Sequence, residues 1–352
     1  MTSPAEGTEK EDLRSSLVRT LHRRSIANGS ITLPAVPALL DEYVSTCLMT
    51  FRALGVEFDA NQIEHLRKTL EDQIAQAFAQ SPRSSIVITY DSPVGQLVNY
   101  HVQPQWTSVE KTYDAWVATR EPPYFGSEPD ARVWTIAAQF TDPRECAVLD
   151  IGAGVGRNSL PLARRGHPVD ALEVSGNFAD VLREQARTQS LGIRVIQRDL
   201  FAARDYLPGD YGLIIVSEVA TDFRSVEDLR FLFELASSAL TDEGYLVVNC
   251  FLARDDYEPD DAARQVGQQT YSSIFTREEL AVATAGLPIE LIDDTSVYDY
   301  EHANLPSESW PPTGWYEGWV LGQDVFPVNR PDIPIELRWL VYRRMSSAEK
   351  ES

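Results

Sequence analysis

Three glycines at alternate positions follow a short apolar segment near the middle of the chain, and this pattern constrains the fold more than any other feature. The apolar residues 147–149 predict a buried strand that ends at Asp150, and a helix is predicted directly after the glycines, from Ser159. The glycines are Gly152, Gly154 and Gly156. Glycine backbone can turn tightly and approach a ligand closely, and a helix N-terminus presents free N–H groups. The pattern therefore predicts a nucleotide-like ligand at the carboxyl edge of a parallel sheet.

Acidic residues also follow the next strands that the sequence predicts. Glu173 follows the apolar run 169–172, and Asp199 follows the run 193–198. A carboxylate in the first position can accept both hydroxyls of a ribose, and one in the second can accept from an adenine amino group. A fourth apolar strand leads to Glu218. Because ligands in open α/β sheets bind outside the carboxyl ends of the strands, we expect these acids to share one pocket.

The spacing of the glycines separates two classes of cofactor. Dinucleotide sites use Gly-x-Gly-x-x-Gly, with a pyrophosphate at the helix N-terminus, whereas this chain has Asp-x-Gly-x-Gly-x-Gly. The carboxylate of Asp150 would repel a pyrophosphate, but it suits a ligand that carries an ammonium group. S-adenosylmethionine has an ammonium, a ribose, an adenine and a sulfonium, and no phosphate, so the residues favour it. Two alternatives stay open: an NAD-dependent oxidoreductase, and a non-catalytic partner subunit that keeps the fold.

Residues 149–173 resemble the TehB-like (tellurite-resistance-type) branch of the class I S-adenosylmethionine-dependent methyltransferases. The shared features are Gly-Arg-Asn-Ser-Leu after the glycines and Val-Asp-Ala before the predicted ribose acid. The resemblance extends over about residues 111–345. It implies an α/β fold with a Rossmann-like, seven-stranded methyltransferase sheet in the strand order 3-2-1-4-5-7-6.

The resemblance also implies roles for individual residues. Asp150 and the three glycines would shape the pocket for the methionine part, Glu173 would hold the ribose, and Asp199 would hold the adenine. Arg157 and Asn158 either contact the cofactor carboxylate or face solvent. The predicted cofactor-binding residues are Asp150, Gly152, Ala153, Gly154, Gly156, Arg157, Asn158, Glu173, Val174, Asp199, Leu200 and Ser217.

The chain of 352 residues is long enough for two domains. We expect a mainly helical accessory unit over residues 1–105 and the methyltransferase domain over 106–346. The elements predicted in the accessory unit are helices at about 10–27, 36–54 and 60–80, and a β-hairpin made of 86–90 and 97–102.

Capping boxes predict three helix starts in the second part of the chain. These pairs are Ser127 with Asp130, Ser225 with Asp228, and Thr276 with Glu279.

Two insertions are expected between the later elements of the sheet. The acidic segment 252–273 is predicted to be a solvated loop. Residues 296–332 are rich in Trp, Tyr and Pro, and a connection of this length is uncommon in a compact domain unless it is functional or disordered. We interpret this segment as an aromatic lid over the substrate, in preference to an interface patch or a segment that packs on the domain without a functional role.

Composition narrows the classes of partner and location. The formal net charge is −22, with 31 basic and 53 acidic residues, which disfavours binding to nucleic acid or to an anionic membrane. No apolar run approaches the ~20 residues that a membrane span needs, and the first ten residues are polar. Cys47, Cys146 and Cys250 are widely spaced in apolar surroundings, so we expect buried free thiols, no metal site, and a cytoplasmic location.

These observations predict an enzyme that methylates an oxygen or nitrogen of a small molecule or peptide by in-line displacement. A sulfonium leaving group needs no acid, so alignment of the acceptor and exclusion of water matter most. A general base is required only for a hydroxyl or a protonated amine. The candidate catalytic residues are Glu218, after the fourth strand, and His302, in the aromatic insertion; Asp222 and His101 are further candidates.

Overall fold

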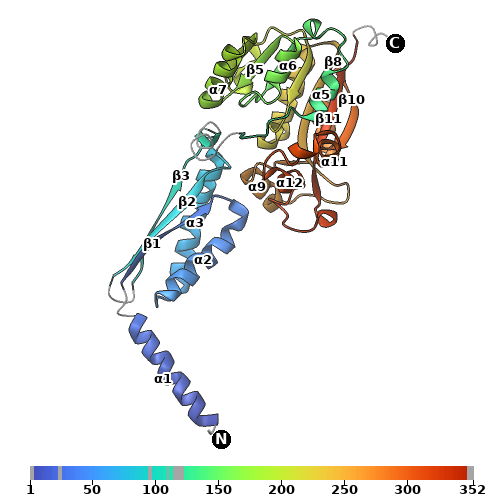
Figure 1. Cartoon of the computed structure of the whole chain (residues 1–352). Helices are drawn as coiled ribbons and strands as arrows, with labels where there is room; N and C mark the ends of the chain where they lie inside the picture. The colour runs from blue at the N-terminus through green and yellow to red at the C-terminus, as the bar shows by residue number, and fades with distance from the viewer. Residues whose placement is uncertain (1–3, 23–25, 94–96, 109–110, 114–122, 347–352) are drawn as a thin grey trace. The chain divides into compact units, whose positions relative to one another are not determined.

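The computed structural model describes residues 4–22, 26–93, 97–108, 111–113 and 123–346 (Figure 1). The chain divides into two compact units, residues 1–108 and residues 109–352. Because each unit has its own core, each is described by itself.

The first unit combines helices with a small antiparallel sheet. Its three strands lie in the order β1-β2-β3, and α2 and α3 pack together beside them. Phe51 of α2 and Leu66 and Leu70 of α3 are fully buried in the core of this unit. The elements are α1 (Pro4–His22), β1 (Ala27–Pro34), the 3₁₀ turn η1 (Pro37–Leu39), α2 (Leu40–Ala53), α3 (Ala60–Gln80), β2 (Ser85–Ser92) and β3 (Asn99–Gln105).

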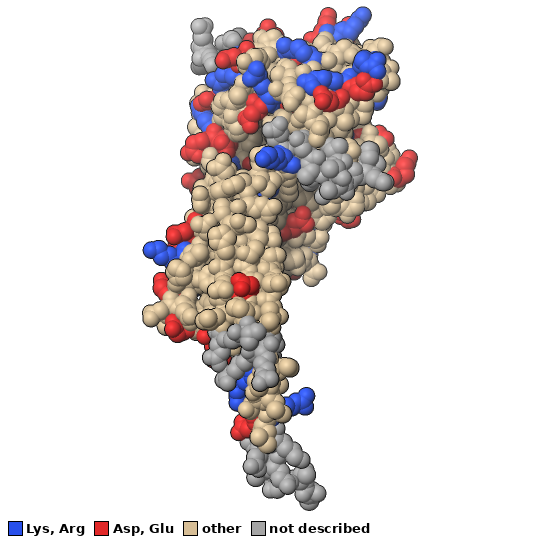
Figure 2. Space-filling model, turned by 90° about the vertical axis from the view of Figure 1, so that its left-hand side faces the viewer, with Lys and Arg blue, Asp and Glu red and all other residues tan. Residues whose placement is uncertain are grey.

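Two predicted helices and the hairpin are found in this unit, but one strand was missed. The predicted helix 10–27 ends at His22, and β1 begins at Ala27 and pairs along its whole length with β2. The sequence did not predict this strand because the Asn-Gly-Ser segment near its start contains poor strand formers. On the sheet face away from the helices the exposed residues include Ser30, Thr32 and Thr89, and few charged side chains are visible there (Figure 2).

The second unit is built on a mixed sheet with the strand order β10-β11-β8-β7-β4-β5-β6. Neighbouring strands from β8 to β6 are parallel, and β11 is antiparallel to both of its neighbours. Numbered along the domain, this is the predicted order 3-2-1-4-5-7-6, which is confirmed, with the short β9 as an additional partner of β8. The strands are β4 (Val148–Ile151), β5 (Val169–Glu173), β6 (Ile193–Gln197), β7 (Tyr211–Val216), β8 (Leu240–Ala253), β9 (Ile274–Phe275), β10 (Ile289–Ser296) and β11 (Ile335–Arg344).

The central strands are apolar throughout because helices cover both faces of the sheet. All residues of β4 and β7 are buried. Ile214 of β7 packs in one core with the helix α8, and Leu213 packs in the other with α5 and α6. The helices are α5 (Ala131–Ala137), α6 (Ser159–Arg165), α7 (Gly176–Thr188), α8 (Val226–Ala239), α9 (Asp261–Gln269), α10 (Arg277–Thr284), α11 (Val297–Asn304) and α12 (Tyr316–Val320).

The capping box predicted at Ser127 is wrong, whereas those at Ser225 and Thr276 are present. Helix α5 begins at Ala131, and the side chain of Asp130 makes no capping bond because it pairs with Arg157 instead. The carboxylate of Glu301 caps α5 in its place, accepting from the backbone N–H groups of residues 131 and 132 at 2.7 and 3.1 Å. A carboxylate supplied 170 positions away in the sequence cannot be found by a local capping pattern.

Both predicted insertions contain helices. The segment 252–273 is not a simple solvated loop: it contains α9, which is capped by the Asp260 carboxylate. The segment 296–332 contains α11, α12 and two 3₁₀ turns, η6 (Ser307–Ser309) and η7 (Arg330–Asp332). Tyr316 and Trp319 of α12 are buried in the core with β8 and β11.

Three further predictions concern the chain as a whole. Cys47, Cys146 and Cys250 are free and buried, as expected. Within the described ranges, no helix has the length and apolar character needed to cross a membrane. The same residues contain no group of three or more His, Cys, Asp or Glu side chains arranged to hold a metal ion.

Candidate active site

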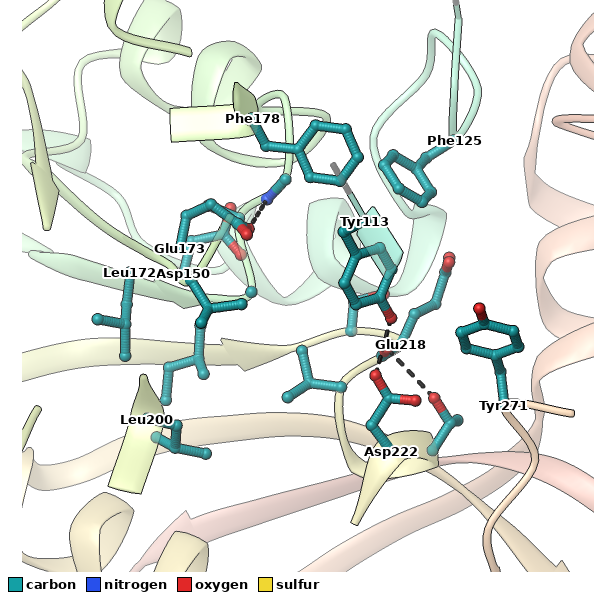
Figure 3. A pocket seen from close by; sticks show the side chains of 18 of the residues that line it. Tyr113, Phe125, Asp150, Leu172, Glu173, Phe178, Leu200, Glu218, Asp222 and Tyr271 are labelled. Atoms are coloured by element: carbon teal, nitrogen blue, oxygen red, sulfur yellow. Dashed lines mark hydrogen bonds between the residues drawn. The ribbon is translucent and has the colours of Figure 1, made fainter. Parts of the chain in front are cut away.

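A cavity of about 360 Å³ lies in the second unit at the carboxyl ends of β4, β5 and β7 (Figure 3). Neighbouring parallel strands place their carboxyl ends at one edge of the sheet, which brings residues far apart in the sequence together. Among the predicted residues, Gly156 and His302 do not line the cavity. Those that line it are Asp150, Gly152, Ala153, Gly154, Arg157, Asn158, Glu173, Val174, Asp199, Leu200, Ser217 and Glu218.

The three glycines of the turn have left-handed backbone conformations, with φ of +71°, +54° and +95° at Gly152, Gly154 and Gly156. A Cβ at Gly152 would lie 2.2 Å from a methyl group of Val219, and one at Gly156 would lie 2.5 Å from a methyl group of Leu182. A Cβ at Gly154 would instead lie at ordinary contact distance from the Phe125 ring, 3.6 Å away, on the cavity side. The outer glycines therefore allow the turn to pack, and the middle one keeps its backbone open to the cavity.

Glu173 ties the end of β5 to the glycine turn. Its carboxylate accepts from the backbone N–H of Gly154 and from that of Ser175, each at 2.7 Å. The side chain is buried, and both carboxylate oxygens can accept further hydrogen bonds because each has a second lone pair. The residue predicted to hold a ribose is thus fixed at the correct strand end by the backbone itself.

The two other predicted acids have contrasting environments. Asp150 is 2% exposed and accepts from the Ser159 hydroxyl at 2.6 Å, and burial raises the pKa of its carboxyl group to about 7. Asp199 is exposed and accepts from the backbone N–H of Phe201 at 2.8 Å. A charged group that binds beside Asp150 will therefore change the protonation of its carboxyl group.

Arg157 is held in a buried cluster of charges. One terminal nitrogen of its guanidinium lies 2.8 Å from the Asp130 carboxylate and the other lies 2.5 Å from that of Glu218. Asn158 completes the cluster, because its amide donates to Asp130 at 2.9 Å and accepts from the backbone N–H of Asp130 at 3.0 Å. These two residues therefore join the glycine turn to the start of α5, and neither one simply faces solvent.

Glu218 follows β7 in a strained conformation, with φ of +60°. Its backbone N–H donates to the side chain of Asn249 at 2.7 Å. Burial raises the pKa of its carboxyl group, although the guanidinium of Arg157 opposes this shift. Glu218 was predicted because it follows a strand. Its hydrogen bond with Asn249 on β8 could not be predicted, because only the fold brings the two residues together.

Several residues that line the cavity were not predicted. The hydroxyl of Tyr113 donates to Asp222 at 2.8 Å, and the indole N–H of Trp319 donates to the carbonyl of Tyr271 at 3.0 Å. Figure 3 shows the rings of Tyr113, Phe125 and Phe178 gathered along one side of the cavity. Tyr113 and Phe125 precede α5 in the sequence, and the structure places both in the cavity wall.

His302 is a correction to the predicted catalytic set. It is exposed, and its ring stacks on that of Tyr298, with centroids 5.6 Å apart, and meets the edge of Trp310. It does not line the cavity. The other candidate histidine, His101, lies on β3 of the first unit. Of the predicted aromatic insertion, only Trp315, Trp319 and Asp324 reach the cavity.

Comparison with known proteins finds a domain match and a partial relative. Residues 148–244 match the family model described as "Methyltransferase domain". The chain carries a methyltransferase domain. It is 30% identical over 120 residues to the probable S-adenosyl-L-methionine-dependent methyltransferase TehB of Haemophilus influenzae (strain 10810), in agreement with the predicted resemblance. This match covers 34% of the chain and 40% of that relative, so it spans less than half of either protein.

Solved structures are also similar to parts of this chain. The [4+2]-cyclase SpnF is 14% identical, with a TM-score of 0.48, and the match covers 68% of this chain and 96% of that one. TehB from Haemophilus influenzae is 15% identical, with a TM-score of 0.40, covering 73% and 74%. At these scores the likenesses carry no argument about chemistry.

Proposed function

We propose that this protein is a methyltransferase that uses S-adenosylmethionine to methylate an oxygen or nitrogen of a small molecule or peptide. The observation that carries the proposal is the convergence of Asp150, Glu173 and Asp199 on one cavity beside an open glycine turn. S-adenosylmethionine is the cofactor of the family that the domain matches, in agreement with the prediction from the residues. The net charge of −22 supports an acceptor other than nucleic acid.

The residues that line the cavity fit this cofactor. Glu173 would accept from the ribose hydroxyls, Asp199 from the adenine amino group, and Asp150 would face the ammonium of the methionine part. The backbone at Gly154 stays open because a side chain there would enter the cavity. When bound, S-adenosylmethionine supplies an electrophilic methyl group carried on a sulfonium. Alignment of an acceptor by the surrounding side chains can provide about 7–11 kcal/mol of the barrier reduction.

Glu218 is the general base in this proposal, and His302 has no part in it. The Glu218 carboxylate is largely buried beside the cavity and held by Arg157, and its raised pKa favours acceptance of a proton. A base positioned in this way contributes about 10²–10⁴-fold when the acceptor must lose a proton.

The aromatic insertion has a narrower role than a lid over the whole site. Trp315 and Trp319 line the cavity, while Trp319 and Tyr316 are also part of the buried core. We propose that these rings exclude water from the acceptor side as a fixed wall. The buried free thiols favour a reducing compartment, so the proposed location is the cytoplasm.

Calorimetric titration of the full chain with S-adenosylmethionine, S-adenosylhomocysteine and NAD tests the cofactor. The first two should bind with micromolar affinity and NAD should not bind. Micromolar NAD binding without either adenosyl ligand would instead identify an oxidoreductase. Methyl transfer from radiolabelled S-adenosylmethionine to a panel of hydroxyl and amine acceptors then separates an enzyme from a non-catalytic subunit that only binds.

A further inference from the structure

The cavity has a second side that the predicted cofactor residues do not cover. Asp150 and Glu173 lie on one side of the view in Figure 3, and Glu218, Asp222 and Tyr271 lie on the other. The sheet order explains this division, because β4 and β5 carry the first pair and the segments after β7 and α9 carry the second group. This second side is where an acceptor would meet the cofactor, so any assignment of the acceptor from its residues rests on the proposed function.

Carboxylates supply most of the charge on the acceptor side. Glu218 and Asp222 line it, and Asp324 of the aromatic insertion also lines the cavity. The described residues that line the whole cavity include two cationic side chains, Arg157 and Arg198. An anionic acceptor would therefore meet several like charges and few opposite ones.

Neither arginine is placed to receive an anionic acceptor. Both terminal nitrogens of Arg157 are engaged by buried carboxylates, at 2.8 Å from Asp130 and 2.5 Å from Glu218. The Arg198 guanidinium lies over the Tyr206 ring, 3.6 Å from its centroid, and the residue directly precedes the predicted adenine acid. The charge of Arg157 is thus already balanced by two carboxylates of the protein, and Arg198 lies next to the predicted adenine acid.

Aromatic rings form the rest of the acceptor side. The rings of Tyr113 and Tyr271 lie with centroids 6.4 Å apart, and those of Trp315 and Trp319 lie 5.6 Å apart. All four line the cavity. The faces of aromatic rings attract cations, and they do so more strongly where water is excluded. Carboxylates interleaved with aromatic faces form a binding site for a positively charged group.

We propose that the methyl acceptor is an amine that enters this site as an ammonium cation and is methylated on nitrogen. Asp222, fixed by the Tyr113 hydroxyl, and the aromatic faces bind the cation. The ammonium loses one proton to the Glu218 carboxylate, which gives the neutral amine. The nitrogen lone pair then forms the new N–C bond as the carbon–sulfur bond breaks, and the electron pair of that bond stays on sulfur. The positive charge moves from sulfur to nitrogen, towards the carboxylates that favour it.

A set of three probes of matched size tests the charge preference. Tyramine, tyrosol and 4-hydroxyphenylacetate share one aromatic skeleton and carry a cation, a neutral hydroxyl and an anion at its end. Each is titrated by calorimetry at neutral pH into the full chain saturated with S-adenosylhomocysteine. We expect tyramine to bind about tenfold or more tightly than tyrosol, and the anion to show no binding.

Two variants make the test specific to the acceptor side. Asp222→Asn keeps an acceptor for the Tyr113 hydroxyl but removes the charge, so the preference for tyramine over tyrosol should fall by about fivefold or more while S-adenosylhomocysteine affinity stays unchanged. Asp332→Asn makes the same change at an exposed position that does not line the cavity, and it should leave both quantities unchanged.

The outcomes separate this inference from the proposed function. If S-adenosylhomocysteine itself does not bind, the proposed function fails. If it binds but tyramine shows no advantage over tyrosol, including the case in which neither binds, the inference about the amine is overturned and the cofactor assignment stands. Tighter binding of the anion than of the amine overturns it as well.

Discussion

The two sides of the cavity are built in different ways. Apart from Ser217, the cofactor side comes from one continuous stretch, from β4 to the turn after β6, and two of its acids, Glu173 and Asp199, are held by backbone N–H groups. The acceptor side is assembled from segments far apart in the sequence and is held by side chains, as in the bond from Tyr113 to Asp222. A single substitution can therefore change the acceptor side without disturbing the backbone that positions the cofactor.

The two kinds of support tolerate substitution to different degrees. Hydrogen bonds from the backbone survive most substitutions of neighbouring side chains, so a cofactor site of this kind is independent of what the protein methylates. Contacts between side chains, such as those around Arg157, depend on every partner being present. The class of cofactor is thus a local property of the chain, whereas the acceptor is a property of the whole fold.

The largest effect on cofactor affinity is expected from Gly154→Val on the cofactor side. A β-branched residue is strained at φ +54°, and its methyl groups would enter the cavity beside Phe125. We expect S-adenosylhomocysteine binding to weaken by more than about a hundredfold, which is roughly 2.8 kcal/mol. Calorimetry gives the affinity, and a thermal melt shows that the variant is folded. Unchanged affinity in a folded variant would place the cofactor elsewhere.

Arg157→Met tests whether the two sides depend on one another through the buried charges. The substitution leaves Asp130 and Glu218 buried without their cation. Removal of one partner from a buried ion pair costs about 3–5 kcal/mol, and we expect a loss of stability of this size in urea unfolding. Arg144→Met is the control, because its ion pair with Asp142 is on an exposed side chain and should contribute no more than about 1 kcal/mol. Equal losses in the two variants would mean that the buried cluster has no special role.

A change of pH is expected to have a smaller effect, on the affinity for S-adenosylhomocysteine. The pKa of Asp150 is raised to about 7 by burial, above the ordinary value of about 3.9, so its protonated form stabilises the folded state. That contribution is fully present below about pH 4 and is lost as the pH rises to about 7. A bound ammonium favours the ionised carboxylate, so affinity for S-adenosylhomocysteine should rise up to about tenfold per pH unit below 7 and then level off.

Asp150→Asn is the matched variant for this pH dependence. It removes the titrating group but keeps an acceptor for the Ser159 hydroxyl, so its affinity should vary little between about pH 5.5 and 7.5. Affinity is a better measurement than stability here, because the Glu301 carboxyl also has a pKa raised to about 7 by burial and does not line the cavity. A slope that persists in the variant would assign the titration to another group.

The contrast between the locally built cofactor side and the acceptor side, which is assembled from distant segments, also explains how much could be predicted from the sequence. The acids at the strand ends follow from patterns that span a few residues each, and the strand order follows from the resemblance to methyltransferases; the structure has this order and places the acids together. The cap of α5 could not be predicted, because Glu301 reaches it from the other end of the domain. The roles of Tyr271 and Asn249 could not be predicted either, because only the packing of the sheet brings Tyr271 to the cavity and Asn249 to Glu218.

The smallest effect is expected from His302, one of the two residues that the sequence proposed as catalytic, and Glu218 is its comparison. Glu218→Gln should slow methyl transfer by about 10²-fold or more for an acceptor that must lose a proton. His302→Ala should leave the rate unchanged, because the ring stacks on Tyr298 at an exposed position outside the cavity, and it should cost no more than about 1 kcal/mol of stability from lost ring contacts. Steady-state rates of both variants with one acceptor decide between them. A large loss of rate in the His302 variant would mean that α11 moves towards the cavity during catalysis, and that the acceptor side is less rigid than its packing indicates.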